Sequence, residues 1–206
     1  MHDEALSQST RELLTVFTKH RKLLEGFYLT GGTALTLHLG HRESDDLDFF
    51  SQRPFNSQRL LQHLEPMGRS DNVELDKGTL NAYINKVKVQ FLHYPYKLLE
   101  KPRDWKGITI SSLIDIACTK CVTISTRGSK KDFIDMYALL QHYSLKEILR
   151  KVKQKYQEID YSEPAILKSL VYFEEAQLQP MPRLHINVEW EEVKINISQK
   201  VKSFRI

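Results

Sequence analysis

The stretch that most constrains the fold of this chain covers residues 27–51, FYLTGGTALTLHLGHRESDDLDFFS. A short apolar run ends at the pair Gly31 and Gly32, and a helix-like run follows it. A second apolar run then carries two aspartates, Asp46 and Asp48. This order predicts a strand, a tight turn into a helix, and a second strand.

The two aspartates predict a cation site. Successive strand residues point to opposite faces, so Asp46 and Asp48 are expected on one face. Paired carboxylates suit Mg²⁺, which commonly completes its shell with substrate phosphates. The turn at Gly31 and Gly32 suits those phosphates, because the free N–H groups and the dipole of a helix N-terminus favour an anion. The alternative is an ordinary strand–helix turn followed by an edge strand with a solvated acidic face.

Composition limits the class of protein. A chain of 206 residues with 41% hydrophobic content can form one ordinary core with a helical appendage. Its net charge of +4 permits a nucleic-acid partner without requiring one. The polar N-terminus and the lack of a long apolar run lead us to expect a cytoplasmic protein without a membrane span. Two cysteines are too few for a disulfide-built fold.

The pattern of apolar residues predicts a mixed α/β first half and a helical second half. We expect helices at 3–25, 33–39 and 56–64, and strands at 27–30, 44–51, 72–76, 79–84 and 88–93. Residues 94–102 are expected to be irregular. Further helices are expected at 112–126, 131–141, 145–157 and 163–173, and the last ~20 residues read either as a helix or as a strand-like arm. The predicted domains are therefore 1–108, an α/β domain, and 109–206, a helical region that completes the site.

Lys120 and Arg127 lie seven residues apart on a predicted helix, so they share a face. The neighbours of Lys120 are unusually apolar for a lysine. We interpret Lys120 as a cation aimed at a triphosphate, with Arg127 assisting. The alternative is a lysine whose stem packs at the helix edge while its charge reaches water.

Asp132 and Asp135 lie on one face at the start of the next predicted helix. They either compensate the helix dipole or serve the site, by orienting Lys120 or by acting as general base on an attacking hydroxyl. Cys118 and Cys121 have C-x-x-C spacing but no second pair. Because zinc sites need about four ligands, we predict two buried, reduced thiols.

A polymerase-like site takes a third carboxylate from a neighbouring strand, and that position is occupied here by Gln90. Three hypotheses remain open. Two acids and the nucleotide phosphates suffice, or Glu74 or Asp76 from the preceding strand substitutes, or the protein binds nucleotide without much catalysis.

With these residues collected, the sequence resembles the AbiEii/AbiGii toxin family of nucleotidyltransferase-like proteins over nearly the whole chain. The matching segments are Leu29-Thr-Gly-Gly-Thr-Ala-Leu35, His41-Arg-Glu-Ser-Asp-Asp-Leu-Asp-Phe-Phe50, Tyr94-Pro-Tyr96, Asp115-Ile-Ala-x-x-Lys120, Arg127-Gly-Ser-Lys-Lys-Asp-Phe-Ile-Asp135, Leu170-Val-Tyr-Phe173 and Pro180-Met-Pro182. The resemblance implies a nucleotidyltransferase-like fold, a small mixed β-sheet with flanking helices joined to a helical C-terminal region.

The resemblance also implies a site that binds nucleotide and Mg²⁺. Its residues would be Gly32, Thr33, Asp46 and Asp48, completed by Lys120 and an acid among Asp132 and Asp135. Many nucleotidyltransferases have Gly-Ser at the turn, so the resemblance implies that a direct serine contact is either lost here or replaced by Thr33. Family members include toxins of toxin–antitoxin pairs, some of which transfer nucleotides to tRNA ends, so an antitoxin protein is a possible partner.

These observations lead to one leading hypothesis and one alternative. The leading hypothesis is a Mg²⁺-dependent transfer of NMP from a nucleoside triphosphate to an RNA (tRNA) or protein hydroxyl. The expected nucleotide contacts are Gly31, Gly32, Thr33, Arg42, Arg127 and Lys131. The alternative is a catalytically weak or degenerate module that binds nucleotide or nucleic acid.

Overall fold

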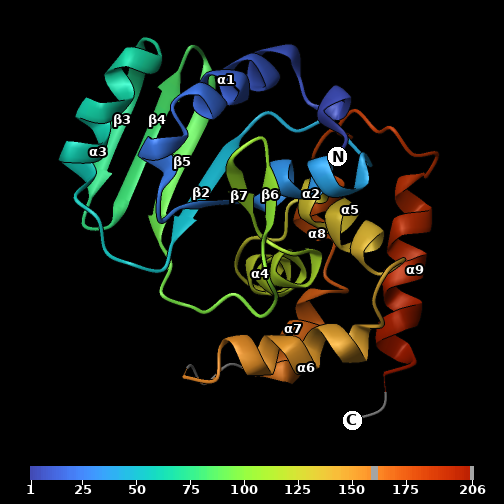
Figure 1. The fold of residues 1–206 in the computed structure, drawn as a ribbon. Coiled ribbons are helices and arrows are strands. Elements are labelled where there is room, and N and C mark those ends of the chain that lie inside the picture. The colour runs from blue at the N-terminus through green and yellow to red at the C-terminus, as the bar shows by residue number, and fades with distance from the viewer. Residues whose placement is uncertain (159–161, 205–206) are drawn as a thin grey trace. The chain divides into compact units, whose positions relative to one another are not determined.

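The computed structural model describes residues 1–158 and 162–204, and the chain forms two compact units. One unit comprises Met1–Lys97 with Lys101–Ser111, and the other comprises Leu98–Glu100 with Ser112–Ile206. The first unit contains the β-sheet, and the described part of the second is helical (Figure 1). None of the helices in residues 1–158 and 162–204 is both long and apolar enough to span a membrane. The expected division into domains 1–108 and 109–206 stays a prediction.

A mixed seven-stranded sheet dominates the first unit, with strand order β3-β4-β5-β2-β1-β7-β6. Strand β2 runs antiparallel to β1 and parallel to β5, and β1 runs parallel to β7. The mixed α/β fold class is therefore confirmed. The strands are β1 (Tyr28–Thr30), β2 (Leu47–Ser51), β3 (Ser70–Asp76), β4 (Thr79–Ile84), β5 (Val87–His93), β6 (Arg103–Trp105) and β7 (Ile108–Ile110).

Apolar side chains on one face of the sheet form the core of this unit. Buried residues alternate with more exposed ones along β4 and β5, as expected for a sheet covered on one face. Phe17 of α1 (Gln8–Lys19) packs on Phe49 at a ring-centroid distance of 5.2 Å, and Phe49 stacks on Phe91 at 5.0 Å. The alternation therefore turns Asp48 and Gln90 toward the opposite face.

The remaining helices of the first unit are α2 (Gly31–Leu39) and α3 (Ser57–Leu64), with single 3₁₀ turns at Asp3–Ala5, Arg21–Leu24 and Glu65–Met67. The prediction of one helix over 3–25 is wrong. Leu6 is extended, and the Ser7 hydroxyl accepts a hydrogen bond from the Thr10 N–H, so a new helix begins at Gln8.

A short hairpin, β6–β7, was not predicted. Its turn residues Lys106 and Gly107 have φ values of +52° and +85°, as a two-residue type I′ turn requires. Each strand has only three residues. The sequence pattern is therefore too short to separate this hairpin from the irregular segment before it.

The second unit consists of α4 (Leu113–Thr126), α5 (Lys130–Leu139), α6 (Leu145–Lys155), α7 (Glu163–Ser169), α8 (Glu174–Gln177) and α9 (Trp190–Lys202). Serine hydroxyls cap four of these N-termini, those of α4, α5, α6 and α7. The helix predicted over 163–173 is shorter than expected, because it ends at Ser169 and a separate short helix, α8, begins at Glu174. Of the two alternatives for the C-terminal segment, the helix is correct.

Candidate active site

The turn after β1 presents uncapped backbone N–H groups. Helix α2 begins directly at Gly31, whose φ of +69° is a conformation that favours glycine. The N–H groups of Gly31, Gly32 and Thr33 lie in the first turn, where a helix offers no intrahelical acceptor. The N-cap residue, Thr30, makes no side-chain capping hydrogen bond. This end of α2 is therefore suited to an anion.

Asp48 lies directly against this turn. A Cβ atom added to Gly31 would collide with the Asp48 carboxylate oxygen Oδ2. The close approach is possible because β1 pairs with β2 in a register that places Thr30 opposite Asp48. A candidate metal ligand and a candidate phosphate turn are thereby brought into contact.

Thr33 connects the turn to the segment that carries Asp46. Its side chain is fully buried, and its hydroxyl donates a hydrogen bond to the backbone carbonyl of Asp46. The same hydroxyl lies 2.9 Å from Ser44 Oγ. Thr33 can therefore offer its N–H group to a phosphate, whereas its hydroxyl holds Asp46 in place. Ser44 was not recognised from the sequence as part of this arrangement.

The buried side chain of Arg42 packs against the turn at Gly32. The residue is 2% exposed, and its Nη1 donates to the carbonyl of Glu43 at 2.8 Å. A Cβ atom on Gly32 would lie 2.6 Å from Arg42 Nη2 and 3.2 Å from Ser44 Oγ. The guanidinium thus fills the space that any larger residue at position 32 would need.

Strand β2 begins at Leu47, so the predicted strand 44–51 is too long at its start. The Thr33 hydroxyl donates a hydrogen bond to the Asp46 carbonyl, and the Thr36 hydroxyl donates one to the Arg42 carbonyl. These two carbonyls are then not available for strand pairing. Asp46 consequently precedes the strand and is exposed, whereas Asp48 lies within it and is half-buried.

The register between β2 and β5 identifies the residue that pairs with Asp48. Gln90 on the parallel strand β5 pairs with Asp48, and Gln90 Nε2 donates to Asn81 Oδ1 at 2.8 Å. Glu74 lies on β3, where it pairs with Asn81 of β4. Strand β3 is three strands from β2, so Glu74 is about 14 Å from Asp48 at ordinary strand spacing. Asp76 lies on the same distant strand. The hypothesis that Glu74 or Asp76 supplies the third carboxylate is therefore wrong.

The residues around the turn at Gly31 are suited to a cation that binds together with substrate phosphates. Within residues 1–158 and 162–204, no group of three or more His, Cys, Asp or Glu side chains could hold a metal ion. Mg²⁺ is commonly bound by one or two carboxylates together with waters and substrate phosphates. Asp46 and Asp48, next to an uncapped helix N-terminus, meet that requirement.

In the second unit, Lys120 lies between two carboxylates. Its Nζ atom is 2.7 Å from Asp132 Oδ1 and 2.6 Å from Asp135 Oδ2. The side chains of Lys120, Asp132 and Asp135 are only 9%, 3% and 0% exposed. A lysine that reaches water from a helix edge is therefore excluded, and both acids hold Lys120.

Asp132 also begins helix α5. It forms a capping box with Ser129, and its Oδ2 accepts from the Ser129 hydroxyl at 2.7 Å. Burial opposes the ionisation of Asp132. The charge of Lys120 and the hydrogen bonds from Lys120 and Ser129 outweigh that effect, so the pKa of Asp132 lies below its ordinary value.

Two further predicted cations lie near this cluster. The Arg127 side chain is 72% exposed, and its Nε is 3.9 Å from Asp132 Oδ2. Lys131 is exposed in the first turn of α5. Both side chains are accessible to a ligand from solvent.

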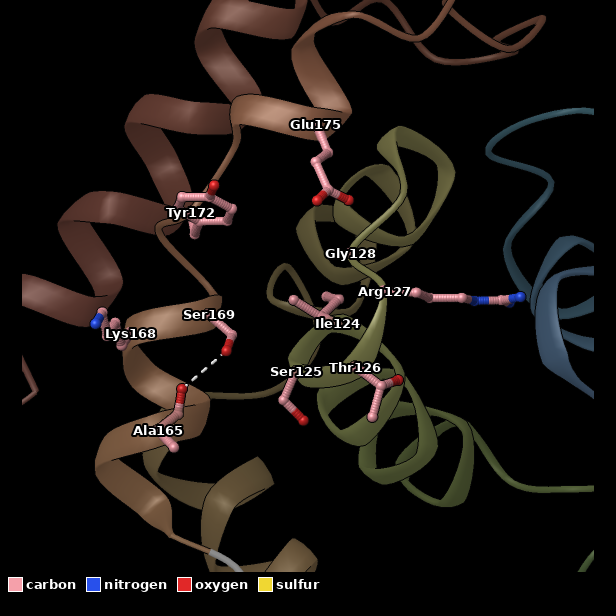
Figure 2. A pocket seen from close by; sticks show the side chains of 10 residues that line it. All are labelled: Ile124, Ser125, Thr126, Arg127, Gly128, Ala165, Lys168, Ser169, Tyr172 and Glu175. Atoms are coloured by element: carbon pink, nitrogen blue, oxygen red, sulfur yellow. Dashed lines mark hydrogen bonds between the residues drawn. The ribbon is translucent and has the colours of Figure 1, made fainter.

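A cavity of about 450 Å³ lies beside the end of α4, but it does not contain the lysine cluster. Figure 2 shows the Glu175 carboxylate directed toward this cavity and the Arg127 side chain directed away from it. Its lining includes the cationic residue Lys168, but it includes none of Lys120, Asp132 and Asp135.

The two cysteines of α4 are structural. Both Cys118 and Cys121 are free and buried. Burial raises the pKa of Cys118 to about 12, and it raises the pKa of Cys121 as well. The prediction of buried, reduced thiols is confirmed.

Asp115 forms a buried node that sequence reasoning did not find. Its carboxylate accepts hydrogen bonds from Leu99 N at 2.9 Å, Ser112 Oγ at 2.7 Å and Lys155 Nζ at 2.7 Å. This node fastens the segment Leu98–Glu100 to α4 and α6. The available signal, an acid three residues after a serine, indicated only the helix cap.

Comparison with known proteins assigns the family. The sequence model described as "Nucleotidyl transferase AbiEii toxin, Type IV TA system" matches residues 13–203. The chain belongs to the AbiEii family of nucleotidyl transferase toxins. An Aquifex aeolicus protein described as uncharacterised is 42% identical to this AbiEii-family chain over 184 residues, which is 86% of this chain and 87% of that protein.

Solved structures support the fold of this AbiEii-family protein. JHP933 from Helicobacter pylori matches with a TM-score of 0.56 at 16% identity, over 96% of this chain and 92% of that one. The nucleotidyltransferase toxin MenT4 from Mycobacterium tuberculosis matches with a TM-score of 0.52 at 12% identity, over 96% of this chain and 86% of that one. At these identities, the matches establish a shared nucleotidyltransferase fold.

Proposed function

We propose that this AbiEii-family protein transfers NMP from a nucleoside triphosphate to a hydroxyl group of RNA or protein, with Mg²⁺ as its cofactor. The contact between Asp48 and Gly31 carries the proposal, because it joins a carboxylate to an uncapped helix N-terminus. Membership of a nucleotidyl transferase family supports the reaction class.

The residues of the first unit would bind the triphosphate. Backbone N–H groups of Gly31, Gly32 and Thr33 would donate hydrogen bonds to phosphate oxygens. Arg42 would hold the turn in shape through its contact with Gly32. Asp46 and Asp48 would hold Mg²⁺, which supplies charge neutralisation on the phosphates when it is bound.

The residues of the second unit would add fixed positive charge. Lys120 would carry this charge, while Asp132 and Asp135 fix the direction of its ammonium group. The lowered pKa of Asp132 and its pairing with Lys120 support this orienting role over a role as general base. Arg127 and Lys131, which reach solvent, would neutralise further phosphate charge.

The transfer itself is a substitution at phosphorus. The acceptor oxygen bonds to the α-phosphorus, and the bond from that phosphorus to the oxygen bridging the β-phosphate breaks. Pyrophosphate leaves with the electron pair, and the proton of the acceptor hydroxyl passes to solvent. Positioning and charge stabilisation supply most of the catalysis in such reactions.

The test is incorporation of label from each of the four α-³²P NTPs into total tRNA and total protein. We expect labelled product with the natural chain and a loss of roughly 100- to 1,000-fold with Asp48→Asn. Asp45→Asn is the matched control, because Asp45 is an exposed neighbouring acid outside the strand. No label from any NTP over a broad acceptor panel would contradict the proposal.

One observation favours a second candidate function. The position beside Asp48 holds Gln90, which is neutral and hydrogen-bonded to Asn81. A protein that binds nucleotide without turnover would have no need of an acid there. Calorimetry separates the candidates, because tight NTP binding that survives both EDTA and Asp46→Ala would support the binder over the enzyme.

The family description also places its members in a toxin–antitoxin system. We propose that this chain acts as the toxin of such a pair and that an antitoxin protein counteracts it. Expression of the chain alone, with Asp48→Asn as the control, should arrest growth only when the carboxylate is present. Equal growth with both forms would contradict this proposal.

A further inference from the structure

The face of the sheet that carries Asp48 continues outward as an open surface. Across β2, β5, β4 and β3, the paired positions are Asp48, Gln90, Asn81 and Glu74. The next row along the strands pairs Lys88 with Tyr83. A hollow of about 530 Å³ includes Asn81, Tyr83 and Lys88 among its lining residues. The candidate metal site and this hollow therefore share one face of one sheet.

Tyr83 and Lys88 are available to a ligand. Tyr83 is 39% exposed although it is a large aromatic residue within a strand. Lys88, its paired neighbour, is exposed, and no ion pair of Lys88 occurs within residues 1–158 and 162–204. An exposed aromatic ring beside a cation suits a nucleobase and its phosphate.

The amide pair lies between Tyr83 and Asp48. Gln90 Nε2 donates to Asn81 Oδ1, which leaves Gln90 Oε1 as an acceptor and Asn81 Nδ2 as a donor. If the oxygen and nitrogen assignments of both amides were exchanged, one donor and one acceptor would still remain for a ligand. The edge of any nucleobase offers the complementary groups.

We propose that Gln90, Asn81, Tyr83 and Lys88 bind the 3′-terminal nucleotides of a single-stranded RNA acceptor. Tyr83 stacks on a base, the amide pair holds a base edge, and Lys88 contacts a phosphate. Tyr83 lies two β-strands from β2, or about 10 Å across the sheet. An RNA bound at Tyr83 can therefore place its 3′ end at Asp48. This inference rests on the proposed nucleotidyl transfer and selects RNA over protein as the acceptor.

The test measures RNA binding and NTP binding separately on the full chain. The RNA probe is a short 5′-fluorescein-labelled single strand of mixed sequence, followed by fluorescence anisotropy. We expect Tyr83→Ala to weaken RNA binding about 5- to 100-fold, whereas Tyr83→Phe keeps it. Lys88→Gln should lower the slope of log affinity against log salt by about 0.7. The matched controls are Tyr172→Ala and Lys19→Gln, which alter exposed residues elsewhere.

Two outcomes would overturn the inference. In the first, Tyr83→Ala weakens RNA binding no more than Tyr172→Ala does. In the second, the label from the NTP is transferred only to protein. Calorimetry with Mg²⁺ and NTP should give the same affinity for Tyr83→Ala as for the natural chain. If the natural chain binds no NTP, the proposed function fails. If NTP binds but RNA binding ignores Tyr83 and Lys88, this inference alone fails.

Discussion

The carboxylate of Asp48 occupies the space where a side chain at Gly31 would begin. This contact links two elements that are seventeen positions apart in sequence, a helix N-terminus and the strand that pairs with β1. It makes glycine obligatory at position 31 for two reasons, because the backbone also has a φ of +69° there. The two reasons can be separated by mutation.

Gly31→Ala should abolish NTP binding, and Gly26→Ala should not. Both glycines have positive φ, but an added Cβ meets nothing within 4 Å at Gly26. Each substitution should cost about 1–2 kcal/mol of folding free energy from backbone strain. Calorimetry with Mg²⁺ and NTP, beside urea unfolding, measures both effects. Equal NTP affinity for the two variants would show that the Asp48 contact is irrelevant to the site.

Removing the charge of Lys120 should destabilise the second unit. Lys120→Met removes the ammonium that lies within 2.7 Å of the buried carboxylates of Asp132 and Asp135, which should cost about 3–5 kcal/mol. Adding Asp135→Asn to Lys120→Met should recover part of that loss, because one of the buried charges is then absent. Urea unfolding measures both. A single variant as stable as the natural chain would contradict the ion-pair account.

Asp132 should make stability depend on pH in the acid range. Its folded pKa is lowered, so its contribution is complete above the unfolded pKa of about 3.9 and is lost as pH falls through the folded pKa. The natural chain should therefore lose more stability between neutral pH and about pH 3 than Asp132→Asn does. Unfolding free energies measured across this range test the point, and parallel curves for the two proteins would refute it.

Asp115→Asn should loosen the segment Leu98–Glu100. The substitution removes the carboxylate charge that lies 2.7 Å from the buried Lys155 ammonium, at a cost of about 3–5 kcal/mol. It should also speed hydrogen exchange at the N–H groups of Leu99 and Glu100, which donate to this carboxylate. Adding Lys155→Met should restore stability without restoring exchange protection. Unchanged exchange at Leu99 in the single variant would count against this role of Asp115.

Local patterns in the sequence were sufficient to single out the Gly-Gly turn with its two aspartates, and Lys120 with the two acids of α5. The Gly-Gly turn and the alternating aspartates lie within one strand–helix–strand unit, so short-range rules place them. Lys120 was singled out because its sequence neighbours are unusually apolar for a lysine, and Asp132 and Asp135 because they share one face at a helix start. Gln90 was expected at the third-carboxylate position of a polymerase-like site, and it pairs with Asp48.

Features that depend on distant pairing were not predictable in the same way. Asn81 meets Gln90 only because β4 and β5 form a hairpin in one particular register. Asp115 and Lys155 are forty positions apart and belong to different helices. Thr33 was expected to contact nucleotide, and the sequence did not show that its hydroxyl donates to the distant Asp46 carbonyl.

The most direct test of the central claim is a crystal structure of the full chain soaked with Mn²⁺ and a non-hydrolysable NTP analogue. We predict an anomalous peak bound by Asp46 and Asp48, with phosphate oxygens at the N–H groups of Gly31, Gly32 and Thr33. An ion or a triphosphate bound elsewhere, with Asp48 contacting neither, would contradict the account.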